Sequence, residues 1–352
     1  MKARSSRPLS TRENIAGKQV RIWDDVTPEI FASAIRPQGE PALLRGLVRH
    51  WPIVSEGAAS PFRPVRYLAD RVDSKSIEFS LAPPESNGIL HYRPDTKAFT
   101  YSKRQAPFAE IITALEMAAT APNPPVIAIQ SLDVESHFSG FLDHHAMPLL
   151  PLEITPRIWI GNRAKVATHN DPLDNIACNV AGHRRFTLFP PEQIGNLYMG
   201  PLHVTPAGTP ISMVHLTEPD LDRFPRFVDA LSAAQMAELE PGDALFIPYQ
   251  WYHHVEALDP INILINYWWN DAPRDGGSPW DAMLHAIMAI RQLPPEQRRA
   301  WRANFDHYVF LENGDPGEHL PDFARGILQT STPDDTKSMR AQLLKALSED
   351  IG

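Results

Sequence analysis

The sequence contains a single cysteine, Cys178, in 352 residues. One cysteine cannot form a disulfide within the chain, which excludes the small secreted folds held together by disulfide bonds. Cys178 stands in an apolar run, which predicts a buried and unreactive thiol. A reducing compartment, and therefore a cytoplasmic location, is the simplest interpretation.

Long apolar runs and an excess of positive charge are also missing. No stretch reaches the roughly 18 apolar residues of a transmembrane helix, and the basic residues 1–10 lack the apolar segment of a secretion signal. The formal net charge is −9, whereas nucleic-acid-binding domains usually carry a basic stripe. We therefore expect a protein or small-molecule substrate, no nucleic-acid partner and no membrane association.

Proline, in contrast, is abundant, with 35 residues. It fixes φ and lacks a backbone N–H, so it favours short strands, loops and helix starts over long helices. The 43% hydrophobic and 21% charged residues are ordinary for a globular protein. This composition predicts a mainly β core with elaborate connections.

Short apolar or alternating runs become dense between Arg157 and Asn270. Each is bounded by Gly, Pro, Asn or Asp, which is typical of short strands joined by turns. The runs are 157–161, 175–180, 185–189, 243–247, 253–257 and 261–268. Strands this short and numerous predict a sandwich or barrel, and the jelly roll, a double-stranded β-helix, is one of the few architectures that closes them.

The flanking regions have a different pattern. We expect the polar residues 1–20 to be flexible. Further strands are predicted at 41–47, 77–81 and 89–92, and helices at 65–72 and 107–119. After residue 275 the pattern becomes helical, with starts at Ser278-Pro279, Pro294-Pro295 and Thr332-Pro333. We therefore predict a domain at 21–275 with surrounding helices and a C-terminal helical region at 276–352, which packs on the core or forms a homodimer.

The segment Thr168–Pro172 contains two candidate metal ligands. On an extended strand, side chains at i and i+2 share one face, so His169 and Asp171 can reach the same point while Asn170 turns away. A lone His-X-Asp is common and, by itself, more often a polar pair at a strand end. A third ligand must come from elsewhere in the chain.

The pair His253-His254 offers that ligand. It follows the turn Glu240–Asp243, an apolar strand and Ile247-Pro248. Adjacent strand residues face opposite sides, so only one of the two histidines can point inward. Two imidazoles and one carboxylate form a facial triad that leaves positions open on octahedral iron.

These segments resemble the cupin-like JmjC family, which includes the factor-inhibiting-HIF asparaginyl hydroxylase and many bacterial cupin-like proteins. The resemblance covers most of residues 40–270. The matching segments are 41–47, 51–52, 159–161, 169–171, 182–193, 223–227, 240–243, 251–254 and 266–268. It implies Fe(II) held by His169, Asp171 and His253, with His254 facing outward or supporting the ligands.

Members of this family use 2-oxoglutarate and O₂. The lysine that meets the distal carboxylate of 2-oxoglutarate in the asparaginyl hydroxylase corresponds here to Arg184. Arginine is permanently charged and can bind a carboxylate through two N–H groups, so we expect it to take this role. The alternative is a solvent-exposed arginine on a strand.

Other co-substrate positions follow from the same resemblance. Asn175 and Asn266 match asparagines that contact the co-substrate or surround the metal, Tyr92 falls where a co-substrate tyrosine is expected, and Trp268 matches an aromatic that closes the site. The threonine that binds the distal carboxylate corresponds to Val166, which has no donor. Thr187 is the residue that we expect to substitute for it.

The resulting hypothesis is an Fe(II)- and 2-oxoglutarate-dependent oxygenase that hydroxylates an unactivated C–H bond while 2-oxoglutarate becomes succinate and CO₂. A metal-binding cupin dioxygenase or isomerase without 2-oxoglutarate is one alternative, and a non-catalytic binding protein is another. The pair His144-His145 has no second motif, so a loop or supporting role is predicted for it. The aromatic segment 301–310 is predicted to pack a helix.

Overall fold

The computed structural model describes residues 18–73, 76–272, 276–328 and 332–348. The chain forms two compact units that divide between Asn270 and Asp271. The segment 1–17, most of the N-terminus predicted to be flexible, and residues 273–275, at the predicted domain boundary, lie outside the described residues. Among the described helices, none is long and apolar enough to cross a membrane.

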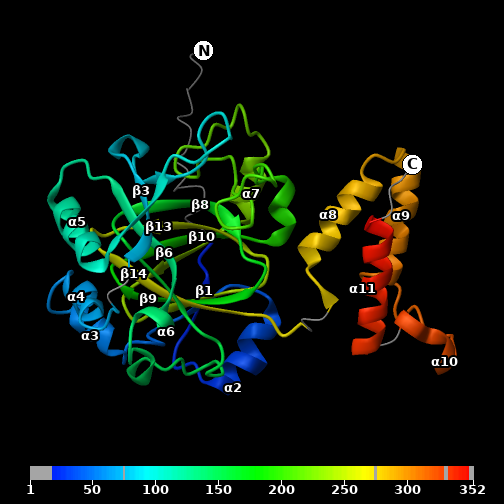
Figure 1. Cartoon of the computed structure of the whole chain (residues 1–352), viewed down its shortest axis with the longest axis horizontal. Coiled ribbons are helices and arrows are strands. Elements are labelled where there is room, and N and C mark those ends of the chain that lie inside the picture. Colours follow the sequence, from blue (N-terminus) through cyan, green and yellow to red (C-terminus); the bar gives the residue numbers. More distant parts are fainter. Residues whose placement is uncertain (1–17, 74–75, 273–275, 329–331, 349–352) are drawn as a thin grey trace, which may run out of the picture. The chain divides into compact units, whose positions relative to one another are not determined.

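The first unit is built on two β-sheets (Figure 1). In order across the sheet, the larger one contains β1 (Arg21–Trp23), β2 (Ala42–Leu44), β12 (Ala244–Ile247), β9 (Asp174–Ala181), β14 (Asn262–Trp269), β7 (Arg157–Gly161), β6 (Val126–Asp133), β3 (Ser76–Ala82) and β5 (Ser102–Pro107). The smaller one contains β11 (Gln235–Leu239), β10 (Arg184–Phe189), β13 (Tyr252–Ala257), β8 (Ala164–Asn170) and β4 (Ile89–Leu90).

Consecutive strands from β7 to β14 alternate between the two sheets, except that β10 and β11 are antiparallel neighbours in the smaller one. Neighbouring strands are antiparallel, apart from β1 with β2 and β4 with β8. This is the double-stranded β-helix that the turn-bounded runs predict. The predicted strands at 41–47, 77–81 and 89–92 contain or overlap β2, β3 and β4.

Apolar side chains alternate between the two faces of each strand. On β10, Phe186 and Leu188 lie between the sheets, whereas Phe189 faces outward and packs near Phe227 of α7 (Phe227–Ala233). The same alternation decides which polar residues of β10 can reach the interior.

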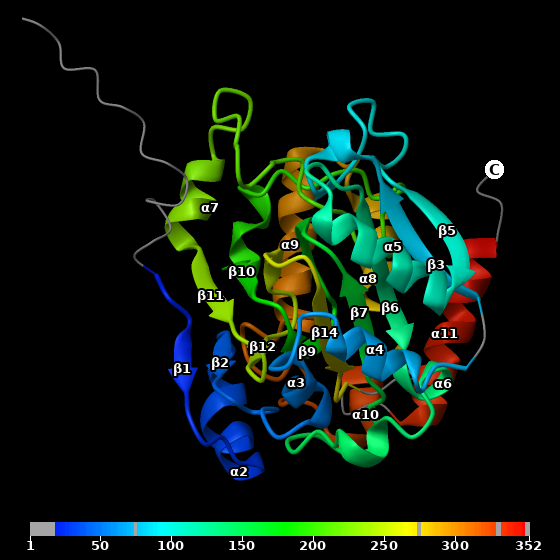
Figure 2. The same ribbon diagram turned by 90° about the vertical axis from the view of Figure 1, so that its left-hand side faces the viewer.

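The largest apolar core lies on the outer face of the nine-stranded sheet, under helices (Figure 2). These helices are α3 (Pro52–Gly57), α4 (Arg63–Ala69), α5 (Phe108–Thr120) and α6 (Val134–His137), and the short α2 (Pro28–Ile30) precedes β2. Leu68 and Leu115 from the helices pack with Ile158 and Cys178 from the sheet, and all four are fully buried. Burial raises the pKa of the Cys178 thiol, which suits an inert core residue.

The second unit is helical. It contains α8 (Pro279–Ile290), α9 (Pro295–Tyr308), α10 (Asp322–Arg325) and α11 (Pro333–Ser348). Ser278 caps α8 by accepting a hydrogen bond from the backbone N–H of Asp281 at 3.3 Å. None of these four helices has a buried side chain.

Candidate metal centre

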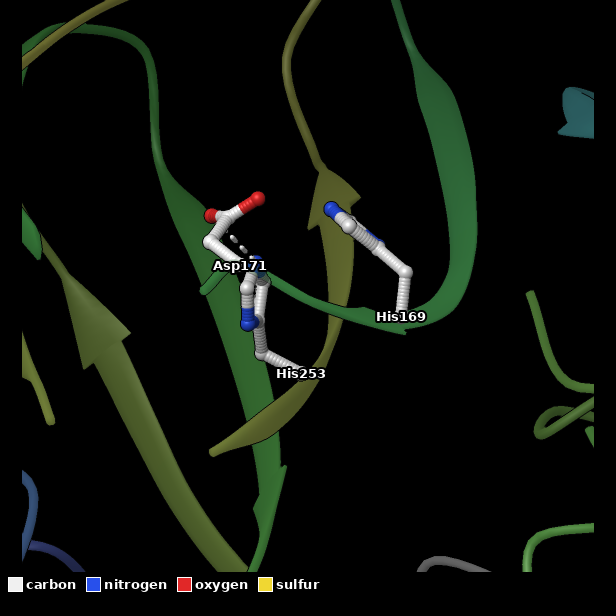
Figure 3. A group of neighbouring side chains, drawn as sticks. All are labelled: His169, Asp171 and His253. Atoms are coloured by element: carbon white, nitrogen blue, oxygen red, sulfur yellow. Dashed lines mark ion pairs between the residues drawn. The ribbon is translucent and has the colours of Figure 1, made fainter. Parts of the chain in front are cut away.

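The three predicted ligands meet at one end of the smaller sheet. His169 lies near the end of β8, Asp171 follows that strand, and His253 is the second residue of β13. The two strands pair so that His253 stands opposite His169. One ligand atom from each residue lies within 4.8 Å of the other two, and Figure 3 shows the side chains turned toward a common point.

The distances between these three side chains suit a cation bound among them rather than hydrogen bonds from one side chain to another. The imidazole centroids of His169 and His253 are 4.3 Å apart. His253 Nε2 lies 3.7 Å from Asp171 Oδ2, which is too long for a hydrogen bond. Two imidazole nitrogens and one carboxylate oxygen form the facial donor set of non-haem iron.

Each histidine is oriented by its own strand. Nδ1 of His169 donates to the carbonyl oxygen of Ala167 at 2.8 Å, and Nδ1 of His253 donates to that of Trp251 at 3.2 Å. A carbonyl can only accept, so each Nδ1 carries a proton, and Nε2 is the nitrogen of each ring that faces the other ligands as a possible metal donor. Burial, reinforced by His169 and opposed by Asp171, lowers the pKa of His253 to about 4. His253 is therefore neutral at pH 7, as a metal ligand must be.

His254 points to the other side of β13. It is buried, and neither ring nitrogen has a hydrogen-bond partner among the described residues. Burial lowers its pKa to about 3. Its cross-strand neighbour is Thr187, which faces the same way. The structure thus brings His253, and not His254, to the other two ligands.

A turn fastens the two strands that carry the ligands. Gln250, at a positive φ of 66°, donates its backbone N–H to the carbonyl oxygen of Asp171 at 3.2 Å. Its side chain accepts a hydrogen bond from Asn170. The backbone N–H of Tyr249 donates to Asp174 Oδ1 at 2.9 Å, and Arg36 pairs with the other oxygen of that carboxylate at 2.8 Å. The positions of Asp171 and His253 therefore depend on each other.

A cavity of about 120 Å³ opens beside the three ligands, between the two sheets. Its wall is mostly apolar, with Leu90, Val166, Phe186 and Val255 among the lining residues. The polar side chains that border it are His169, Asp171, His253, Arg184, Asn175, Asn266, Trp268, Trp159, Tyr101, Gln130 and Thr209. Four of the six predicted co-substrate residues therefore share a cavity with the triad.

Arg184 is the charged residue of this cavity that lacks a counter-ion. It begins β10, points between the sheets, and is 8% exposed. Its Nε is buried without a hydrogen-bond partner, and the described part of the chain gives its guanidinium no ion pair. Burial lowers its pKa to about 10, so it stays a cation at neutral pH. A buried cation without a partner is costly, and an anion that enters the cavity would relieve that cost.

Two asparagines and two tryptophans surround the ligands. Asn266 accepts a hydrogen bond from the indole N–H of Trp159 at 2.8 Å, and its amide lies 3.5 Å from Asn175 Oδ1. Trp268 donates its indole N–H to Asp171 Oδ2 at 3.1 Å. The two indoles pack edge to face, with centroids 6.1 Å apart. Trp268 therefore contacts a metal ligand directly.

The other two predicted co-substrate residues, Thr187 and Tyr92, do not border the cavity. Thr187 faces the outer side of β10, because it is one residue from the inward-facing Phe186. Tyr92 is buried, and its hydroxyl donates to the carbonyl oxygen of Val204 at 2.7 Å. Its ring thus supports a loop rather than a ligand.

Two polar residues that border the cavity have no motif in the sequence. Tyr101 stands just before β5, and burial, with a smaller effect of Tyr92, raises its pKa to about 12. Gln130 lies on β6 and accepts a hydrogen bond from Ser80 at 2.8 Å. A single polar residue in the apolar run 126–130 was the one available signal for Gln130, and no local signal marks Tyr101.

The loop 200–211 forms one wall of the cavity next to the ligands. The backbone N–H of Gly200 donates to the carbonyl of Ile211 at 2.8 Å, which closes the loop. Thr209 donates its hydroxyl to the carbonyl of Asn170 at 3.0 Å, directly before Asp171. Pro206, Ala207, Thr209 and Ile211 border the cavity. The loop is therefore attached to the strand that carries two of the three ligands.

A double-stranded β-helix with two histidines and a carboxylate converging between its sheets defines a metal-binding protein of the cupin type. The cupin-like domain family matches residues 27–275, and the chain belongs to that family. The resemblance to JmjC-type proteins is confirmed by relatives of that type, which include two lysine-specific demethylases, JMJ31 and demethylase 8.

Two relatives illustrate the range. The chain is 26% identical over 323 residues to the tRNA wybutosine-synthesizing protein 5 of Danio rerio, covering 80% of this chain and 88% of that protein. It is 25% identical over 278 residues to the lysine-specific demethylase JMJ31 of Arabidopsis thaliana, covering 69% of this chain and 48% of that protein. Among solved structures, E. coli ycfD matches with a TM-score of 0.41 and 14% identity, over 92% of this chain and 68% of that one.

Proposed function

We propose that the protein is an Fe(II)- and 2-oxoglutarate-dependent oxygenase that hydroxylates a protein side chain or a small molecule. The observation that carries this proposal is the buried guanidinium of Arg184, which has no ion pair within the described residues and shares a cavity with His169, Asp171 and His253. A metal centre alone does not require such a cation, whereas a co-substrate with two carboxylates does. The lysine-specific demethylase among the relatives supports the oxidative assignment.

The three ligands fit Fe(II) by their chemistry. They supply two imidazole nitrogens and one carboxylate oxygen, a donor set that would leave positions on iron open for 2-oxoglutarate and O₂. Iron bound at these three residues would supply the oxidation of a substrate C–H to C–OH, while 2-oxoglutarate and O₂ yield succinate and CO₂. The residues of the chain position the reactants and keep water away.

Arg184 would bind the carboxylate of 2-oxoglutarate that is distant from the metal. Guanidinium matches a carboxylate with two parallel N–H donors. The Tyr101 hydroxyl and the Gln130 amide border the same cavity and can add donors, whereas Val166 offers none. The apolar wall strengthens such a pairing, because electrostatic interactions are less screened away from water.

The substrate class follows from the charge of the chain and is part of the proposal. A formal net charge of −9 disfavours a polyanionic partner. The Danio rerio relative is named for a tRNA product and the Arabidopsis relative for lysine residues. For this chain, the charge favours a protein side chain or a small molecule over nucleic acid.

The test compares two neighbouring arginines of β10. Anaerobic addition of 2-oxoglutarate to the Fe(II)-loaded protein should produce a visible charge-transfer band that reports its affinity. In Arg184→Gln we expect this affinity to fall by about 2 kcal/mol or more, roughly 30-fold, because one partner of a buried charge pair is lost.

Arg185→Gln is the matched control. Arg185 faces outward and pairs with Glu238 at 2.5 Å and Glu256 at 3.6 Å, so the affinity for 2-oxoglutarate should stay that of the wild type. Absence of the band, together with no succinate formed in air, would contradict the proposal. A thermal shift caused by metal with no further shift from 2-oxoglutarate would instead favour a cupin enzyme without this co-substrate.

A further inference from the structure

The three ligand side chains are held in place by different means. Each histidine uses its Nδ1 to donate to the carbonyl oxygen of the residue two positions earlier, Ala167 for His169 and Trp251 for His253. Both bonds are local along the chain. Within the described residues, no such local bond holds the carboxylate of Asp171, which lies beyond the end of β8.

Trp268 supplies the missing support. Within the described part of the chain, its indole N–H is the hydrogen-bond donor to the Asp171 carboxylate, at 3.1 Å from Oδ2. Trp268 belongs to β14 of the larger sheet, whereas Asp171 follows β8 of the smaller one. The bond therefore connects the two sheets at the metal centre. An indole N–H can only donate and does not titrate near neutral pH, so it orients the carboxylate at every pH at which the protein works.

The packing of the indole restricts its own movement. Trp159 meets the Trp268 ring edge to face, at 6.1 Å and 88°. The N–H of Trp159 is itself engaged, because it donates to Asn266 at 2.8 Å. The chain thus places two indole donors in one cavity, of which one reaches a metal ligand and the other does not.

We propose that Trp268 is a positioning residue for the metal centre, whose indole N–H holds the Asp171 carboxylate in the orientation that binds the metal. The inference rests on the metal-binding part of the proposed function and is independent of 2-oxoglutarate. Removing a group that hydrogen-bonds a metal ligand typically weakens metal binding by roughly 10- to 100-fold.

The experiment uses the full chain and Mn(II) alone, with free Mn(II) measured by electron paramagnetic resonance. Trp268→Phe removes the N–H and keeps an aromatic ring, and we expect Mn(II) to bind roughly 10- to 100-fold more weakly. Trp159→Phe keeps an aromatic ring beside Trp268 and removes an N–H that bonds Asn266 rather than a metal ligand, so the Mn(II) affinity should stay within about twofold of the wild type. With Co(II) bound, Trp268→Phe should alter the visible absorption spectrum and Trp159→Phe should not. Both variants change the packing of the two rings, so this difference would report the lost hydrogen bond to Asp171.

Trp268→Gln separates the hydrogen bond from the ring. The glutamine amide nitrogen stands the same number of bonds from Cα as the indole nitrogen, so this variant should recover part of the affinity lost in Trp268→Phe. Equal Mn(II) affinities for the wild type and Trp268→Phe, or no recovery in Trp268→Gln, would overturn the inference. A wild type that binds no Mn(II) would overturn the proposed metal centre itself.

Discussion

At the scale of single residues, histidines with similar burial have different chemistry because their ring nitrogens have different partners. His253 has one nitrogen bonded to a carbonyl and the other close to a carboxylate. His145 is equally buried, but the backbone engages both of its nitrogens: Nδ1 donates to Phe141 O at 2.7 Å, and Nε2 accepts from Ile53 N at 3.3 Å. His145 therefore has no lone pair left for a metal.

The packing of His145 explains its role. Its ring stacks on Phe141 with centroids 3.8 Å apart and meets Trp51 and Tyr67 at their edges. Burial lowers its pKa to about 4, and the positive charge of Arg71 acts in the same direction. The neutral ring ties α3 to the segment around residue 141.

This histidine predicts a loss of stability in acid. Its folded pKa of about 4 lies below the unfolded value of 6.5, so the unfolded chain binds the proton first, and stability falls as the pH drops from 6.5 to 4. In His145→Gln, which does not titrate, we expect the decrease in unfolding free energy between pH 7 and pH 5 to be smaller by about 1 kcal/mol. Urea denaturation of both proteins at the two pH values measures this. If the unfolding free energy of the wild type and of His145→Gln depended on pH in the same way, groups other than His145 would cause the acid sensitivity.

At the scale of elements, the loop 200–211 is fixed by close packing. A Cβ atom on Gly200 would lie 2.6 Å from Tyr92 Cε2 and 3.0 Å from the carbonyl oxygen of Ile211. The Tyr92 hydroxyl holds the loop at Val204 on the other side of the ring. Glycine is thus required at 200 by the approach of the tyrosine, and the loop wall beside the metal depends on both residues.

Gly200→Ala is therefore expected to destabilise the fold. Inserting a methyl group into this contact should lower the unfolding free energy by about 1–3 kcal/mol, and the shifted loop should become a site of protease cleavage. Chemical denaturation and limited proteolysis measure the two effects.

The matched control is Gly195→Ala, at the end of the short helix Pro191–Gly195. A Cβ atom there would meet nothing within 4 Å, so we expect a change within about 0.5 kcal/mol. Equal effects of the two substitutions would show that the loop can move at no cost, contrary to the packing of Tyr92.

At the scale of the whole molecule, the helical unit has apolar side chains that its own helices do not cover. On α11, Met339, Leu343 and Leu347 recur every four residues and form a stripe that is 36–54% exposed. On α9, Trp301 and Tyr308 are 48% and 52% exposed. We propose a second copy of the chain as the partner that covers them, because an apolar stripe is complementary to itself and two-fold dimers are the commonest assemblies.

The dimer predicts a mass of twice the 39.5 kDa of the chain in solution. Size-exclusion chromatography with light scattering should show this mass for the wild type and the mass of one chain for the double variant Leu343→Asp, Leu347→Asp. Gln342→Asp, which adds one negative charge at an exposed position of α11 outside the stripe, should remain dimeric. A wild type of 39.5 kDa would leave the stripe to another partner and contradict the proposal.

Much of the fold follows from local pattern. The turn-bounded apolar runs between 157 and 270 match β7, β9, β10, β12, β13 and β14, whereas β8 and β11 are not among those runs. The Ser-Pro and Thr-Pro pairs lie at the starts of α8 and α11. His169 and Asp171 were predictable together because they are two residues apart, and the structure places both beside His253. The alternation of side chains along a strand and the capping of a helix depend on residues close together in the sequence, so a local pattern is enough to predict them.

Which polar residues border the cavity depends on how the two sheets pack. Tyr92 and Thr187 carry suitable groups at expected positions, yet the course of the chain turns them away from the cavity. Tyr101 and Gln130 border it without any local motif. Which face of a strand is inside depends on register with partners far along the chain, and one residue of shift exchanges the faces.

The sequence by itself therefore determined most of the strands and the helix starts, and it predicted the three candidate metal ligands. Only the tertiary structure decided that Arg184 is buried with no counter-ion among the described residues and that Trp268 reaches Asp171, 97 residues away. The physical reason is that burial, charge pairing and a hydrogen bond between sheets arise when distant segments pack together. No spacing along the chain encodes them.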